Sequence, residues 1–210
     1  MNLYLIRHAD PDYASDSLTA RGFEQAERLA EHLRDVPFTH VYCSPLGRAQ
    51  RTMAPTARDR ELTPVTLEWL REMRCDMGIG HASWNVTAAE LAAEADLAGR
   101  VAGFMDPQVP EVLAGLDALL GAHGYRRAGP EFHCLDHADD ADLCAVFAHA
   151  GLIMTLVAAL FHLPLADFYA AVQYPPTGIT HLRMVRNGGG AELRMLTFAA
   201  RPHLGFLEEY

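Results

Sequence analysis

The chain has 210 residues, of which 50% are hydrophobic and 21% charged, with 17 basic and 27 acidic side chains and a formal net charge of −10. This composition excludes a disordered chain, a collagen-like repeat and a small disulfide scaffold. The length predicts a single domain, residues 1–210, that can bury a sizeable core. The negative charge argues against nucleic acid as a partner, because a phosphate backbone requires a basic face. A small phosphorylated substrate remains compatible, since a few arginines can make a local positive pocket.

Four cysteines without a CxxC pair indicate reduced thiols, and Met1 leads into an apolar run with no basic leader, so we expect a cytoplasmic protein. Residues 143–161 carry no formal charge, but they contain Gly151 and are preceded by aspartates rather than basic residues. We interpret this stretch as a buried strand, a turn and a buried helix, and expect no membrane association.

The first elements alternate between strand and helix. Residues 2–6 are nearly all apolar, which predicts a strand buried on both faces that ends at Arg7 and His8. A polar loop spans 9–17. The apolar spacing over 19–34 predicts an amphipathic helix, with Thr19 as its N-cap.

A second strand is predicted at 40–43, followed by a helix that starts at Gly47, continues to about residue 53 and is kinked or interrupted by Pro55. Residues 65–67 are a third candidate strand. The alanine-rich middle, about 77–140, is expected to be mostly helical and to form a lid or cap inserted in the domain. Its clearest predicted helices are 88–98 and 112–123.

The C-terminal part repeats the pattern. A buried strand at 143–147 leads through a turn at 149–151 into a helix at 152–161. A second helix is expected at 165–172. Finally, strands at 180–185 and 192–198 flank residues 187–190, which predicts an antiparallel hairpin, and its edge could support a homodimer.

Strands that alternate with helices predict an α/β fold: a three-layer α/β/α sandwich with a mostly parallel sheet, helices on both faces and a C-terminal antiparallel hairpin. In such sheets ligands bind outside the carboxyl ends of the strands. Three loops would therefore meet at one edge: the loop that begins with Arg7 and His8, residues 44–48 with Arg48, and the turn that starts at His149.

Two arginines and two histidines at one edge suit phosphoryl chemistry. A guanidinium offers a planar fork of donors that matches phosphate oxygens, and the start of the helix near Arg48 would add backbone amides. An unprotonated imidazole can attack phosphorus, a second histidine can donate to the phosphoryl oxygens, and a carboxylic acid must protonate an alkoxide leaving group.

Four segments, in this order, resemble the histidine phosphatase superfamily, the phosphoglycerate mutase-like group. LIRHA at 5–9 is similar to its Arg-His-Gly signature, and LTARGFEQA at 18–26 to its LTxxGxxQA helix start. SPLGRAQRT at 44–52 is similar to its SPLxRAxxT segment, and FAHAG at 147–151 to its late xxHxG turn. Together they span nearly the whole chain.

The resemblance implies that His8 is the nucleophile that becomes a phosphohistidine, and that Arg7, Arg48 and His149 hold the phosphoryl group. The proton donor of this family lies in a Leu-x-Glu segment, which Leu70-Arg71-Glu72 fits best, so Glu72 is the expected acid and later base. Glu68 and Asp76 are the alternatives. No cofactor and no metal are implied.

Two departures bear on the activity. Ala9 replaces the signature glycine, which is tolerable if its φ is negative. The loop that contains Asp10 and Tyr13, both candidate substrate contacts, differs from that of phosphoglycerate mutases. We therefore expect a phosphomonoesterase acting on a small phosphomonoester, with a mutase-type phosphotransferase as the alternative.

Two other hypotheses are alternatives to a phosphomonoesterase of this family. HCLDH at 133–137, followed by Asp139, Asp140 and Asp142, could indicate a metallohydrolase, but an acidic solvated loop explains the run better. The pocket could also bind a phosphorylated ligand without turnover, as a pseudophosphatase, although a pure binder does not need His8.

Overall fold

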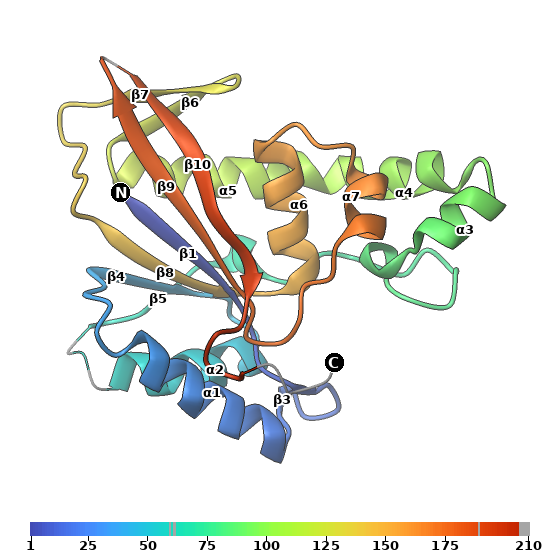
Figure 1. The fold of residues 1–210 in the computed structure, drawn as a ribbon, viewed down its shortest axis with the longest axis horizontal. Coiled ribbons are helices and arrows are strands. Elements are labelled where there is room, and N and C mark those ends of the chain that lie inside the picture. Colours follow the sequence, from blue (N-terminus) through green and yellow to red (C-terminus); the bar gives the residue numbers. More distant parts are fainter. Residues whose placement is uncertain (59, 61, 189, 206–210) are drawn as a thin grey trace.

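A computed structural model describes residues 1–58, 60, 62–188 and 190–205. Among them, eight strands form one mixed sheet in the order β5-β4-β8-β1-β9-β10-β7-β6 (Figure 1). The parallel half consists of β1 (Asn2–Arg7), β4 (His40–Cys43), β5 (Val65–Thr66) and β8 (Leu143–Ala148). The antiparallel half consists of β6 (Tyr125–Ala128), β7 (Glu131–Cys134), β9 (Ile179–Asn187) and β10 (Gly190–Ala200). The short strands β2 (Pro11–Asp12) and β3 (Ser17–Leu18) pair separately.

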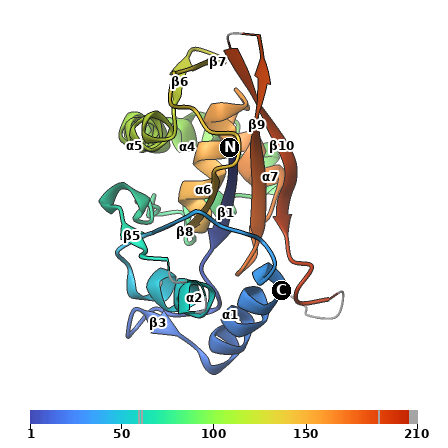
Figure 2. The same cartoon turned by 90° about the vertical axis from the view of Figure 1, so that its left-hand side faces the viewer.

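Helices cover both faces of the sheet, which confirms the predicted three-layer sandwich. Helices α1 (Ala20–Leu33) and α2 (Gly47–Arg58) lie side by side on one face (Figures 1 and 2). The other face carries α5 (Val109–Ala122) and α6 (Ala150–Leu160), with α3 (Ala88–Ala93), α4 (Leu97–Met105) and α7 (Leu165–Ala171) extending from them (Figure 1). Single 3-10 turns occur at Glu68–Leu70, Ser83–Asn85 and Asp106–Gln108.

The central strands are buried on both sides because their successive side chains enter two different cores. In β1, Leu5 packs with the α5–α6 core and Ile6 with the α1–α2 core. In β8, Val146 packs with the α5–α6 core and Phe147 with the α1–α2 core. This alternation explains why these strands read as continuous apolar runs in the sequence.

The N-terminal part of α1 follows the prediction, whereas α2 departs from it. The hydroxyl of Thr19 accepts a hydrogen bond from the amide of Gly22, so Thr19 is the N-cap. The expected interruption at Pro55 is wrong, because α2 runs through it to Arg58. Continuing the helix keeps Met53 and Thr56 on its buried face, which outweighs the amide that Pro55 lacks.

The middle of the chain is less helical than predicted. A single helix over 88–98 is wrong, because α3 ends at Ala93 and Glu94 is extended before α4 begins. The β6–β7 hairpin was not predicted; it joins β10 at the edge of the main sheet. Its strands are only four residues each, too short for a strong alternating pattern. A lid role for residues 77–140 stays a prediction.

The uncharged stretch 143–161 divides into β8 and α6, as predicted. No helix in the described part of the chain is long and apolar enough to span a bilayer. The C-terminal hairpin is confirmed as β9 and β10, although Gly189, in its predicted turn, lies outside the described residues. Strand β10 pairs with β7 only through Gly190 and Ala191. Dimerisation along its remaining edge stays a prediction.

Candidate active site

The carboxyl ends of β1, β8 and β4 bring the predicted loops together. Arg7 lies opposite Ala148 in the β1–β8 register, and the amide of His8 donates to the Ala148 carbonyl at 2.9 Å. On the other side of β8, the amide of Ser44 donates to the Phe147 carbonyl at 2.9 Å. The rings of His8 and His149 consequently lie with their centroids 5.1 Å apart.

The imidazole of His8 is buried and held in one tautomer. Its Nδ1 lies 2.7 Å from the backbone carbonyl oxygen of Ala9. Because a carbonyl only accepts, Nδ1 carries the proton and Nε2 keeps its lone pair. Burial, reinforced by the charges of Arg7 and Arg48, lowers the pKa of His8 to about 3. The ring is therefore neutral near pH 7, which is the state a nucleophile needs.

Ala9 fits where the resembled signature has glycine. Its φ is negative, as the sequence analysis required for alanine to be tolerated. Its amide donates to the hydroxyl of Thr52 at 2.9 Å, and that hydroxyl donates to the carbonyl of Arg48 at 2.8 Å. Thr52, which sequence reasoning quoted only as part of a motif, thus connects the loop after His8 to α2.

His149 is oriented by Ser44. The Ser44 hydroxyl oxygen accepts from the amide of Leu46 at 3.2 Å and lies 2.8 Å from Nε2 of His149. If the hydroxyl donates to Nε2, the ring proton is on Nδ1, and this buried atom has no protein partner in the described part of the chain. Burial and the nearby His8 hold the pKa of His149 far below its usual range. Sequence reasoning assigned no role to Ser44.

Two arginine nitrogens complete a set of unpaired donors. Nε of Arg7 and Nε of Arg48 are buried and, among the described residues, hydrogen-bond to nothing in the protein. Nη1 of Arg7 donates to the backbone carbonyl of Tyr174, which orients its guanidinium. Buried donors are rarely left unpaired, so with Nδ1 of His149 they indicate a site for an anion.

The carboxylate of Asp16 binds the start of α2, near the amides that are expected to bind a substrate oxyanion. Its carboxylate accepts from the amide of Gly47 at 2.6 Å and from Nη1 of Arg48 at 2.7 Å. A Cβ at Gly47 would lie 2.2 Å from the carbonyl oxygen of Asp16, so this approach requires glycine. A carboxylate therefore occupies the amide of Gly47. That amides after Arg48 bind an oxyanion stays a prediction.

The two other predicted contacts, Tyr13 and Asp10, behave differently. The ring of Tyr13 lies 5.4 Å from the guanidinium carbon of Arg48, and its hydroxyl interacts with Arg7, so it lies beside both cations. Asp10 instead accepts a 2.6 Å hydrogen bond from the hydroxyl of Thr19. Its carboxylate thus braces the loop against the start of α1 and points to no unpaired donor.

Glu72 contacts the first turn of α6, the helix that follows His149. Its Oε1 accepts from the amides of Met73 and Leu152, each at 3.1 Å. Burial raises the pKa of Glu72 to about 7, although these amides and Arg7 oppose the shift. A carboxyl group that titrates near neutrality can both donate and accept a proton.

The two alternative acids lie at the surface. Glu68 is 75% exposed and pairs with Arg71 at 2.8 Å. The carboxylate of Asp76 accepts from the amide of Gly78 at 2.9 Å, and the residue is exposed.

A cavity of about 540 Å³ opens beside this centre. Arg7 belongs to the centre and also lines the cavity. Apolar side chains line much of it, with Trp84 at the start of α6, where a Cβ on Gly151 would lie 2.3 Å from the indole. Asn85, Thr87 and Gln173 add polar groups. Arg7 is its one formally charged lining residue in the described part of the chain.

The predicted candidate metal run does not form a cluster. His133 and Cys134 belong to β7, whereas Asp142 accepts from Nδ1 of His123 at 2.7 Å. Among the described residues, the three-residue group that could hold a metal lies elsewhere, at the amino ends of β4 and β8.

Comparison with known proteins agrees with this geometry. The family model for the histidine phosphatase superfamily (branch 1) matches residues 3–197. The "Adenosylcobalamin/alpha-ribazole phosphatase" of Salmonella typhimurium is 27% identical over 180 residues, covering 80% of this chain and 84% of that protein. The "Probable phosphoglycerate mutase GpmB" of Proteus mirabilis is 34% identical over 88 residues, 38% of this chain and 40% of that protein. A phosphoserine phosphatase structure from Entamoeba histolytica, in complex with 3-phosphoglyceric acid, shares the fold with a TM-score of 0.69 and 21% identity, covering 97% of this chain and 98% of that one.

Proposed function

The chain belongs to the histidine phosphatase superfamily, and within this family we propose that it is a phosphomonoesterase that works through a phosphohistidine on His8. One observation carries the proposal. A neutral, buried imidazole with its Nε2 lone pair available shares a site with three buried donors, on Arg7, Arg48 and His149, that have no hydrogen-bond partner among the described residues. A phosphoryl group would supply acceptors for these donors and an electrophile for His8.

In the first step, Nε2 of His8 attacks phosphorus, and the bond from phosphorus to the leaving oxygen breaks. The carboxyl proton of Glu72 moves to that oxygen, so the product leaves as a neutral alcohol. In the second step, the Glu72 carboxylate takes a proton from water, which attacks phosphorus and breaks the bond to Nε2. Inorganic phosphate leaves, and His8 and Glu72 return to their starting states.

The two arginines and His149 stabilise the charge that spreads over the equatorial oxygens of the phosphoryl group. Tyr13, which lies beside both cations, is placed to contact the substrate. We assign no substrate contact to Asp10, because its carboxylate is bound to Thr19. No step in this cycle requires a metal or a cofactor.

The cavity beside Arg7 bears on the leaving group. Its lining combines Trp84 and Met154 with amide and hydroxyl groups, and Arg7, its one charge, is already committed to the phosphoryl group. This favours an uncharged, partly apolar leaving alcohol. The α-ribazole phosphatase named among the relatives makes α-ribazole 5'-phosphate the first substrate to assay, since its leaving alcohol is an uncharged nucleoside.

A mutase-type phosphotransferase is the alternative, in line with the GpmB relative. A mutase must retain a doubly anionic phosphoglycerate, and the described cavity offers no second cation for it. The geometry therefore favours hydrolysis. A binding protein without turnover is disfavoured because His8 is neutral, oriented and surrounded by donors.

The test measures phosphate release in EDTA from α-ribazole 5'-phosphate, 3-phosphoglycerate, phosphoserine and nitrophenyl phosphate, with wild type and His8→Ala in parallel. We expect release that survives EDTA, disappears in the variant and is fastest for the nucleoside phosphate. Wild type quenched in alkaline denaturant, where a phosphohistidine is stable, should carry phosphate on His8. Full activity in His8→Ala, or interconversion of phosphoglycerates without net release, would overturn the proposal.

A further inference from the structure

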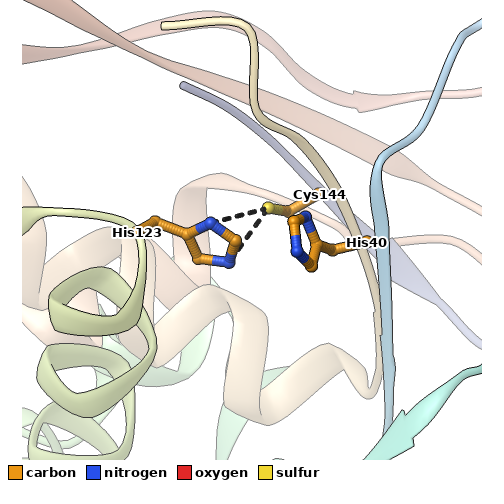
Figure 3. Close-up of side chains that lie close together, drawn as sticks. All are labelled: His40, His123 and Cys144. Carbon is orange, nitrogen blue, oxygen red and sulfur yellow. Dashed lines mark hydrogen bonds between the residues drawn. The ribbon is translucent and has the colours of Figure 1, made fainter. Parts of the chain in front are cut away.

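A second cluster of chemically reactive side chains lies at the amino-terminal ends of β4 and β8, whereas His8 follows the carboxyl end of β1. His40 begins β4, Cys144 lies next to it in the β4–β8 register, and His123 follows the end of α5 (Figure 3). One nitrogen or sulfur atom from each residue can be chosen so that all three lie within 4.8 Å of one another. The proposed phosphatase cycle uses none of these residues.

The hydrogen bonds of His123 fix its tautomer. Its Nδ1 lies 2.7 Å from a carboxylate oxygen of Asp142, which accepts, so Nδ1 carries the proton. Nε2 therefore has the lone pair, and it lies 2.8 Å from the hydroxyl of Tyr42. A carboxylate that fixes the tautomer of a histidine in this way is the usual outer partner of a metal-bound imidazole.

The spacing of the two buried atoms suits a tetrahedral metal. Sγ of Cys144 lies 3.5 Å from Nε2 of His123. Zinc–sulfur and zinc–nitrogen bonds of about 2.3 and 2.0–2.1 Å, at a tetrahedral angle, put the two ligand atoms about 3.6 Å apart. Sγ also lies 4.0 Å from Nδ1, so it sits over the face of the imidazole, and the ring must turn for Nε2 and Sγ to bind one metal.

His40 supplies the adjustable side of the cluster. Its ring centroid lies 4.6 Å from that of His123, and its side chain is 45% exposed, so the ring can rotate toward the other two residues. Asp142 lies 3.8 Å from Nδ1 of His40, which adds negative charge beside the cluster. Solvent on the His40 side can provide a fourth ligand.

We propose that His40, His123 and Cys144 form a binding site for a zinc ion, separate from the phosphatase site. Thiolate and imidazole ligands favour zinc over magnesium or calcium, which prefer oxygen. On binding, the Cys144 thiol loses its proton to solvent and forms a sulfur–zinc bond, while Nε2 of His123 exchanges the Tyr42 hydroxyl for the metal. The ion would tie the end of α5 to the starts of β4 and β8.

The experiment uses the full chain with zinc, and with cobalt as a spectroscopic substitute. Isothermal titration should give one zinc per chain, and cobalt should give a thiolate-to-metal charge-transfer band in the near ultraviolet. His40→Ala tests the site with little risk to folding, because this side chain is half exposed. We expect it to weaken zinc binding at least about tenfold, as loss of a metal-supporting residue generally does. Cys144→Ser should abolish the charge-transfer band.

His133→Ala is the matched control, since His133 lies on β7 outside the cluster. It should leave zinc affinity unchanged. Zinc should also raise the melting temperature of wild type and His133→Ala, but not that of His40→Ala. Equal zinc affinity in wild type and His40→Ala, or no stoichiometric binding by folded wild type, would overturn the proposal. Phosphatase activity plays no part in these readouts, so the two proposals can fail independently.

Discussion

The carboxylate of Glu72 and the backbone amide of Leu152 are joined by a 3.1 Å hydrogen bond across 80 positions of sequence. This contact fixes the carboxylate at the N-terminus of α6, the helix that begins immediately after His149. Burial raises the pKa of Glu72 to about 7, while the helix amides limit that rise. The contact brings the predicted acid, distant in sequence from His149, to the helix that follows this histidine, and its role in proton transfer stays a prediction.

Glu72→Gln should separate substrates by their leaving groups. The amide cannot protonate an alkoxide, so the rate of phosphohistidine formation from alkyl phosphates should fall about 10²–10⁴-fold. Nitrophenyl phosphate should be affected much less in this step, because nitrophenolate leaves without a proton. Rapid-quench measurement of the first turnover checks this. An equal loss on both substrates would move the acid role to Asp76 or Glu68.

The same group sets an expected pH dependence. The first step needs protonated Glu72, so kcat/KM for alkyl phosphates should fall as the pH rises through about 7. No loss from His8 protonation is expected between about pH 4 and 7, since its pKa is lowered to about 3. Nitrophenyl phosphate, measured alongside, corrects for ionisation of the substrate. A fall above pH 7 that persists in Glu72→Gln would exclude Glu72 as its source.

Ionisation of Glu72 should also affect stability. A carboxyl whose pKa is raised by folding favours the native state while protonated, and this contribution is lost as the pH rises from about 4.5 through 7. Glu72→Gln should therefore be at least as stable as wild type at pH 8 by thermal melting. A markedly lower melting temperature of the variant at that pH would contradict the inference that burial in the native state raises the pKa of Glu72.

Ser44→Ala should impair catalysis by releasing His149. Without the hydroxyl, Nε2 of His149 loses its 2.8 Å partner, and the tautomer with a proton on Nδ1 is no longer selected. We expect kcat to fall about fivefold, in line with about 1 kcal/mol for one hydrogen bond. Ser15→Ala, at an exposed loop position, is the control. Ser44→Thr, which retains a hydroxyl, should recover part of the activity; failure of both variants alike would indicate a packing role.

Arg7→Lys should not be a conservative change. An ammonium keeps the charge but cannot both donate to the carbonyl of Tyr174 and present a second nitrogen to a phosphoryl oxygen. Loss of one charge-assisted bond, about 1.5–3 kcal/mol, predicts a fall in kcat/KM of about 10–150-fold. Steady-state kinetics beside Arg194→Lys, an exposed exchange on β10, would check this. Near wild-type kinetics would remove Arg7 from phosphoryl binding.

The architecture, and the meeting of the loops that carry Arg7, Arg48 and His149, could be predicted from the sequence because local signals were strong there. Apolar runs that end in Arg7, Ser44 and His149 predicted parallel strands, and the carboxyl ends of parallel strands necessarily share one edge. The helix spacing and Thr19 cap likewise predicted α1. The weak apolar patterns of β6 and β7, by contrast, did not predict that hairpin, which the structure shows paired with β10.

The contacts between charged side chains, by contrast, follow from the way the elements pack. Asp16 reaches Gly47 and Arg48, Asp10 turns to Thr19, and the orientation of His149 depends on Ser44, 105 positions away. The cluster of His40, His123 and Cys144 is likewise made from three separate segments. Periodicity encodes which residues are buried in a helix or strand. Hydrogen bonds and pKa shifts depend instead on distances and burial, which exist only once those elements are packed together.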